Sequence, residues 1–286
     1  MRGLTVDTSP KRPYSEYYYR NALEKETDKF LKKTISTSKR HFLNLEKEKN
    51  NRGFEDIIKA FVSLYVVNYG IYIKNSEKIV NKFLNIAQKD SAVAFKRAMK
   101  KITKENLSFN LNAPIFKDVL KLKIRQNVSL IKTISTQSFS NIETIVYDAV
   151  TKGQGWGEIE ESLFHQYHIS TEKIKKIARD QAAKTTQSLN ELSQRQSGIE
   201  YFEWQTMEDE RVSEGFGGHE KLNGKIYKWG DTENYPIIDS YGNRGVPSER
   251  VNCRCIALAV ILRENEVLIK QSDGSYKREI KRNAKV

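Results

Sequence analysis

The stretch Tyr201-Phe202-Glu203-Trp204-Gln205-Thr206, which follows closely after Gly198, marks a change in the character of the chain. It is rich in residues that favour strands, and the segment after it holds many Gly, Asn and Asp residues, which are typical of turns and loops. Before it, apolar residues recur at three- and four-residue spacing and proline is rare, which predicts helices. We therefore expect an α+β fold, with a mostly α-helical N-terminal two thirds and a small, loop-rich α+β domain at the C-terminal end.

The helical part divides into segments at glycines, prolines and capping residues. The apolar spacing predicts an exposed helix or arm over residues 17–50 and further helices from 54, over 77–102 and from 114. The Gly-rich stretch at 153–157 should end the last of these, and a short helix over 158–167 should follow. Ser170 or Thr171 would then cap a separate helix that runs to Gly198.

The chain is basic, and its positive charge is concentrated in one region. Lys and Arg number 49 against 36 Asp and Glu, which gives a net charge of +13. Residues 71–132 alone hold 14 Lys and Arg and 4 Asp and Glu, a net of +10. Such a face suits the phosphates of double-stranded DNA, and because few aromatic residues are interleaved with the cations, we expect non-specific binding to the DNA backbone.

The candidate DNA-binding residues lie within this basic region. They are Lys96, Arg97, Lys100, Lys101 and Lys104. The alternative is that these cations form the solvated face of a helical bundle and serve solubility.

Several classes of protein do not fit the sequence. The first residues are too short and polar a run for a signal peptide, and the longest apolar run, 256–262, is far below the roughly 20 residues that span a bilayer. We therefore expect a protein that stays in the cytoplasm where it is made and has no membrane partner. The two cysteines are separated by a single residue, which excludes a disulfide scaffold and suits a reducing compartment.

Four residues offer a donor set for a metal. His219, Cys253 and Cys255 supply one imidazole and two sulfurs, and Asp209 supplies a carboxylate, which together suit a tetrahedral zinc site. The alternative is a metal-free cluster held by hydrogen bonds, with the cysteines packed as small apolar side chains. Zinc is thus a possible cofactor, and no other cofactor is indicated.

The same residues allow an enzyme to be considered. A Cys–His pair can act as a nucleophile and its base. No third orienting group is evident beyond Asn252, the loop glycines give no oxyanion signature, and no recognised protease motif surrounds either cysteine. We therefore assign no catalytic residues and expect a protein that is not an enzyme.

The order of motifs in the C-terminal half resembles the phage head-morphogenesis family related to the F protein of phage Mu. The matching motifs are Ile177-Ala178-Arg179, Trp204, Asp209-Glu210-Arg211-Val212, His219 with Leu222-Asn223-Gly224, and Asn252-Cys253-Arg254-Cys255. From them we take a set of structural motif residues: Arg179, Trp204, Asp209, Arg211, Gly224 and Asn252. The chain departs from the family in two places, with Asp180-Gln181 where Thr-Glu is usual and with a longer path through residues 214–218.

The resemblance covers about residues 115–262 and implies both an organisation and a function. It divides the chain into a charged helical region (1–114), a Mu F-like head-morphogenesis domain (115–262) and a basic C-terminal tail (263–286). It implies a minor head (capsid) protein of the virion, placed in the head interior or at the portal vertex. Its expected partners are the portal protein and the major capsid or scaffold protein, with a role in procapsid assembly and in DNA packaging or delivery. The alternatives are a non-specific DNA-binding protein and a toxin-like enzyme module carried by a phage.

Overall fold

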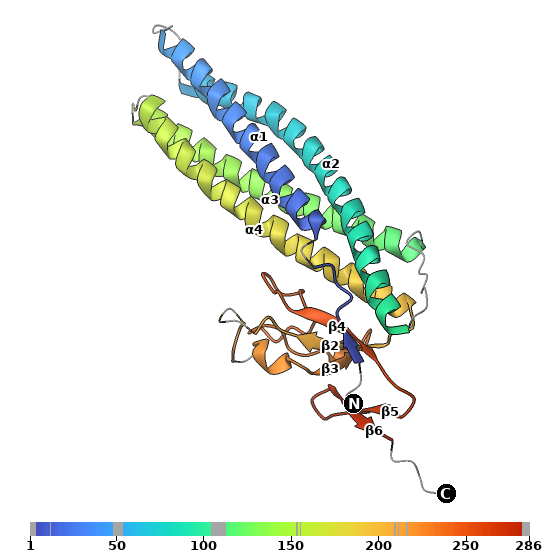
Figure 1. Ribbon diagram of the computed structural model, residues 1–286. Helices are drawn as coiled ribbons and strands as arrows, with labels where there is room; N and C mark the ends of the chain where they lie inside the picture. The colour runs from blue at the N-terminus through green and yellow to red at the C-terminus, as the bar shows by residue number, and fades with distance from the viewer. Residues whose placement is uncertain are drawn as a thin grey trace, which may run out of the picture. The chain divides into compact units, whose positions relative to one another are not determined.

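The chain folds into four long helices and a six-stranded antiparallel sheet (Figure 1), which confirms the predicted α+β class. The structure is a computed structural model, and it describes residues 4–11, 13–47, 54–103, 113–152, 154, 156–208, 210, 212–215 and 217–281. The helices are α1 (Tyr14–Lys47), α2 (Phe54–Thr103), α3 (Pro114–Thr151) and α4 (Trp156–Gln196). Among the described residues, no helix is long and apolar enough to cross a bilayer.

Helices α2 and α4 run without interruption where the sequence predicts two helices each. Near the expected break in α4, the hydroxyl of Ser170 donates to the carbonyl of Gln166 at 2.9 Å, and that of Thr171 donates to the carbonyl of Tyr167 at 3.0 Å. Both hydroxyls therefore bond back within the same helix instead of capping a new one. The expected boundaries rested on local capping preferences, which packing overrides.

The chain divides into two compact units, and we describe each by itself. The first unit consists of Met1–Ser15, Asn85–Leu120 and Asp180–Val286, and the second consists of Glu16–Leu84 and Lys121–Arg179. The boundaries between the units fall within α1, α2, α3 and α4, so each long helix contributes residues to both.

The second unit is helical, and an aromatic core holds it together. The ring of Tyr19 stacks on that of Phe83 with centroids 4.2 Å apart, and its hydroxyl donates to Oδ1 of Asn127 at 2.7 Å. Leu23 and Leu31 of α1 are also buried. Helix α1 is therefore a packed member of this unit and not the exposed arm that the sequence suggests.

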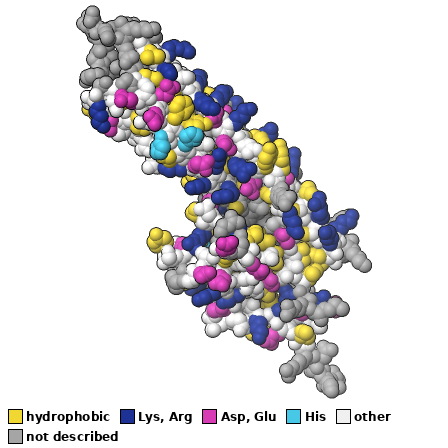
Figure 2. Space-filling view, turned by 60° about the vertical axis from the view of Figure 1, so that its left-hand side comes forward, with side chains coloured by type: hydrophobic (Ala, Val, Ile, Leu, Met, Phe, Trp, Pro, Cys, Tyr) yellow, Lys and Arg dark blue, Asp and Glu magenta, His cyan; other side chains and the backbone are white. Residues whose placement is uncertain are grey.

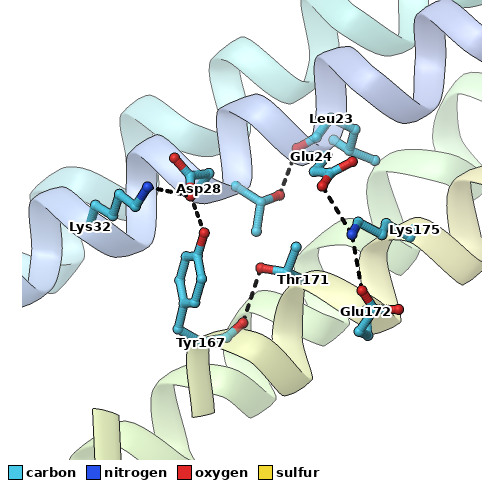
Figure 3. A network of polar contacts seen from close by, with 9 residues as sticks. Leu23, Glu24, Asp28, Lys32, Tyr167, Thr171, Glu172 and Lys175 are labelled. Atoms are coloured by element: carbon cyan, nitrogen blue, oxygen red, sulfur yellow. Dashed lines mark hydrogen bonds and ion pairs between the residues drawn. The ribbon is translucent and has the colours of Figure 1, made fainter. Parts of the chain in front are cut away.

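Polar contacts join α1 to α4 in the second unit (Figure 3). Asp28 of α1 accepts a hydrogen bond from the hydroxyl of Tyr167 on α4. Lys175 of α4 lies 3.0 Å from a carboxylate oxygen of Glu24 on α1 and 3.0 Å from one of Glu172 on its own helix. These pairs are partly exposed, so each contributes little to stability, but together they fix which turns of the two helices face each other.

The first unit contains the sheet, whose strand order is β1-β4-β2-β3-β6-β5. The strands are β1 (Leu4–Val6), β2 (Tyr201–Gln205), β3 (Ile226–Lys228), β4 (Ile256–Ile261), β5 (Glu266–Lys270) and β6 (Tyr276–Ile280). Strand β4 lies between β1 and β2, so the N-terminal strand pairs with a strand from the far end of the chain.

The predicted basic tail, 263–286, is corrected by the structure. Strands β5 and β6 pair with each other, with Leu268 opposite Arg278, and β6 also pairs with β3. The run Glu266-Val267-Leu268-Ile269-Lys270 holds three consecutive apolar residues, two of them β-branched, which suits a strand. An interpretation based on net charge gave no weight to these apolar residues. Residues 282–286 lie outside the described residues.

One face of the sheet carries an aromatic core. Its buried members are Phe202, Trp204, Leu222, Tyr227, Trp229, Tyr235, Ile238, Cys253, Cys255 and Ala257. The ring of Phe202 stacks on that of Trp229 with centroids 4.0 Å apart. The indole N–H of Trp229 donates to Oε1 of Gln194 on α4 at 2.9 Å, so this core is tied to the helix within the same unit.

Candidate functional site

Three of the predicted metal-ligating residues meet in the first unit. His219 lies just before a short 3-10 helix (Glu220–Leu222), and Cys253 and Cys255 lie in the loop that enters β4. Nδ1 of His219 is 3.4 Å from Sγ of Cys253 and 3.4 Å from Sγ of Cys255. All three side chains are buried, and their ligand atoms lie within 4.8 Å of one another. Asp209, the fourth predicted ligand, lies outside the described residues.

The loop before β4 is shaped by two residues in the left-handed backbone conformation, Ser248 with φ of 64° and Asn252 with φ of 60°. The backbone N–H of Asn252 donates to Oδ1 of Asp180 on α4 at 2.8 Å. Ser248 donates its backbone N–H to Sγ of Cys253 at 3.3 Å and its hydroxyl to the carbonyl of Cys255 at 2.9 Å. Such backbone strain persists where neighbouring contacts determine the conformation, as they do here.

The two thiols are strongly inequivalent. A hydrogen bond from the thiol of Cys255 lowers the pKa of Cys253 in spite of its burial. The same hydrogen bond, with burial and the negative charge of Cys253, raises the pKa of Cys255. Cys253 is therefore the more acidic of the two thiols.

The imidazole of His219 is oriented by the backbone. Its Nε2 lies 3.0 Å from the carbonyl oxygen of Ile238. Because a carbonyl only accepts, Nε2 carries the proton, and the lone pair of Nδ1 is left facing the two sulfurs. The indole ring of Trp204 packs edge-on to the imidazole at 5.2 Å between centroids.

A small cavity of about 200 Å³ borders the cluster. His219, Cys253 and Cys255 all line it, and so do Ser213 and Arg250. The guanidinium of Arg250 donates to Oγ of Ser213 at 3.1 Å, and that oxygen also accepts the backbone N–H of His219 at 3.2 Å. The cavity is therefore polar on its outer side and has room for a water molecule or a small ligand beside the sulfurs.

The other motif residues have structural positions. Trp204 is fully buried in β2, and Gly224 adopts a φ of 77° in the turn before β3. The N–H of Gly224 donates to the carbonyl of Trp204 at 2.7 Å, which holds the turn against the strand. Arg179 is exposed on α4 in the second unit. Arg211 lies outside the described residues.

Sequence reasoning missed several residues that build this site. Ile238 acts through its backbone carbonyl, and Ser248 acts through its backbone N–H and its hydroxyl. Asp180 stands out in the sequence solely as a departure from the family pattern. Its contact with Asn252 joins residues 72 positions apart, so nothing in the local sequence indicated it.

The predicted DNA-binding residues lie on α2 in the first unit. Lys96, Arg97, Lys100 and Lys101 are all exposed, while Phe95 and Met99 on the opposite side of the helix are buried. Lys104 lies outside the described residues.

Two of these cations, Arg97 and Lys101, line a larger cavity of about 890 Å³ together with Lys11 and Lys89. Asp7 and Asp90 also line it, so four cations face two anions there. On the face drawn in Figure 2, Lys and Arg side chains are interspersed with Asp and Glu side chains and do not form a single block. The structure thus presents a local cationic surface on α2.

Comparison with known proteins shows which family a part of the chain resembles. Residues 140–258, less than half of the chain, match the family described as "Phage Mu protein F like protein", so this part of the chain is similar to Mu F-like proteins. This confirms the resemblance drawn from the motifs, every one of which lies within the matched residues.

A protein from Haemophilus influenzae, described as uncharacterized, is 26% identical over 198 residues. The similarity covers 69% of this chain and 42% of the Haemophilus protein, so the chain matches less than half the length of that relative. No solved structure matches the chain.

Proposed function

We propose that this protein is a minor head protein of a bacteriophage that associates with the portal vertex and acts in procapsid assembly. Its partners would be the portal protein and the major capsid or scaffold protein, and its place would be the head interior or the portal vertex of the virion. The observation that supports this most directly is the Mu F-like match over residues 140–258, whose described motif residues Trp204, His219, Asn252 and Cys253 lie in one compact unit.

An assembly role suits the His–Cys cluster better than catalysis does. Both thiols are buried, and the loop that carries them is tied to α4 through Asp180 and to itself through Ser248. Contacts of this kind hold a loop in a fixed conformation, which is the role that we propose for the cluster. We therefore propose no enzymatic activity.

The test is quantitative mass spectrometry of procapsids and mature particles purified from producing cells. We expect a few copies of this chain per particle, at a constant ratio to the portal protein. A Trp204→Ala variant should be lost from particles because it empties the core of the sheet, while Tyr241→Ala should be retained because Tyr241 is 90% exposed. Absence of the unaltered chain from both kinds of particle would overturn the proposal.

A second proposed role, contact with packaged DNA during packaging or delivery, is favoured by the exposed cations of α2. Four basic side chains at 96, 97, 100 and 101 are exposed on one helix, which has buried residues on its other side. Binding of this kind is independent of DNA sequence and falls steeply with salt. Binding to DNA without regard to its sequence is compatible with a position of the protein inside the head.

A further inference from the structure

We propose that His219, Cys253 and Cys255 bind one zinc ion, through Nδ1 of the histidine and Sγ of each cysteine. The metal would join the loop that carries His219 to the loop that enters β4. This proposal concerns the stability of the sheet domain, and it does not depend on the function proposed above.

The first support is the spacing of the ligand atoms. With Zn–N of about 2.0–2.1 Å and Zn–S of about 2.3 Å at tetrahedral angles, nitrogen and sulfur ligands lie about 3.5 Å apart. Nδ1 of His219 lies 3.4 Å from each sulfur, which matches this separation for both cysteines at once. A metal could therefore enter the cluster with little movement of the side chains.

The second support is the orientation of the imidazole. Histidines that bind metals usually donate the proton of their other ring nitrogen to a carbonyl or carboxylate, which fixes the ring and the tautomer. Nε2 of His219 makes this contact with the carbonyl of Ile238 at 3.0 Å, so Nδ1 is left unprotonated and directed at the sulfurs.

The third support is the set of donors around the sulfurs. The backbone N–H of Ser248 donates to Sγ of Cys253 at 3.3 Å. The indole N–H of Trp204 is buried without a hydrogen-bond partner among the described groups, and the edge of this ring packs against His219. Donors placed around a pair of sulfurs stabilise negative charge there, as a site with two metal-bound thiolates requires.

The identity of the metal follows from the ligands. Two thiolates and one imidazole form a soft donor set that favours zinc over magnesium or calcium, which prefer oxygen. The fourth position is reachable from the cavity of about 200 Å³ that all three ligands line, so a water molecule would complete the tetrahedron.

The test uses the full chain, purified after growth with added zinc. Elemental analysis should find one zinc per chain, and replacement by cobalt should give the visible absorption of a tetrahedral thiolate site. Because the chain has two cysteines in all, a cobalt–thiolate band has to come from Cys253 and Cys255. Removal of the metal with a chelator should lower the thermal unfolding temperature by several degrees.

Variants then assign the ligands. His219→Asn and Cys253→Ser should lose zinc and the cobalt band, while His165→Gln, a change at an exposed histidine of α4, should keep both. The measurement on the unaltered chain stands even if the cysteine variants fail to fold. Folded, unaltered chain without zinc and without a cobalt band would overturn the proposal, and so would full zinc occupancy in His219→Asn.

Discussion

Asn252 shows how a single residue shapes the site. Its backbone has a φ of 60°, and its N–H donates to Oδ1 of Asp180 at 2.8 Å. This conformation turns the chain directly before Cys253, so the two cysteines that follow point into the core beside His219. Most side chains disfavour the left-handed region, but Asn tolerates it, and Gly adopts it freely.

A pair of substitutions at Asn252 separates backbone strain from side-chain contacts. Since the side chain is exposed, Asn252→Ala should lower the free energy of unfolding by about 1 kcal/mol through strain alone, and Asn252→Gly should stay within about 0.5 kcal/mol of the unaltered chain. Urea denaturation of both variants at equal zinc content would measure this. If the glycine variant were as unstable as the alanine variant, a side-chain contact would have to be responsible instead.

At the scale of residues, sequence reasoning identified the chemistry of the site but not its supports. Histidine and cysteine can be picked out from the sequence because their side chains are common metal ligands. The structure brings His219, Cys253 and Cys255 together. The N–H of Ser248 and the carbonyl of Ile238 could not be predicted, because every residue carries such groups and the fold alone decides which of them face a ligand.

Among the elements, the β5–β6 hairpin is held at its turn by an ion pair. Nζ of Lys225, just before β3, lies 2.8 Å from Oδ2 of Asp273. Ser275 donates its backbone N–H to the other carboxylate oxygen at 3.0 Å. The pair with Lys225, and then the hydrogen bonds from Ser275, lower the pKa of Asp273 from its usual 3.8 to about 2.

This shift predicts a dependence of stability on pH. A carboxyl whose pKa is lowered by folding stabilises the protein above its ordinary pKa, and the contribution is lost as the pH falls through its value in the folded state. Asp273→Asn should therefore destabilise the protein at pH 6, and the difference should shrink between about pH 4 and pH 2. Because the carboxylate is 48% exposed, we expect a loss of no more than about 1 kcal/mol. Unfolding by urea at several pH values would measure it, with Glu264→Gln, at an exposed position, as the control. A difference that did not change with pH would contradict the electrostatic explanation.

The elements differ in how far they could be predicted. The helical part of the chain follows from apolar spacing because helical contacts are local in sequence, although α2 and α4 were each expected as two helices. Strand β1 could not be predicted in the same way, because Leu4 pairs with Ile261 from the opposite end of the chain. The three residues of β1 have a moderate preference for strands, and they form one because they pair with β4.

At the scale of the molecule, the first unit is assembled from three separate segments of the chain. Strand β1 covers the edge of β4, whose run Ile256-Ala257-Leu258-Ala259-Val260-Ile261 is largely buried and would otherwise be an exposed apolar edge. The hydroxyl of Thr8 donates to Oδ1 of Asn190, and Nδ2 of Asn190 donates to the carbonyl of Ala257 at 3.0 Å. The Mu F-like match at 140–258 includes β2, β3 and the first half of β4, whereas β1, β5 and β6 lie outside it, so this sheet extends beyond the matched residues.

The net charge of +13 is a property of the whole chain. Its contribution to DNA binding can be separated by experiment from the contribution of the cations on α2. Changing Lys96, Arg97, Lys100 and Lys101 to Gln removes four positive charges from one face of α2. A control variant with Gln at Lys25, Lys29, Lys33 and Arg40 removes the same charge from exposed positions of α1.

If the α2 cations meet phosphates, the plot of log binding constant against log salt should flatten by roughly 0.9 for each phosphate interaction that the substitutions abolish, so by about 2 if half of the four cations bind phosphate. The control variant should change the slope far less, because uniform charge reduction weakens long-range attraction without removing specific phosphate interactions. Fluorescence anisotropy with duplex DNA over a range of salt concentrations would give both slopes. Equal slopes for the two variants would assign the α2 cations to solubility.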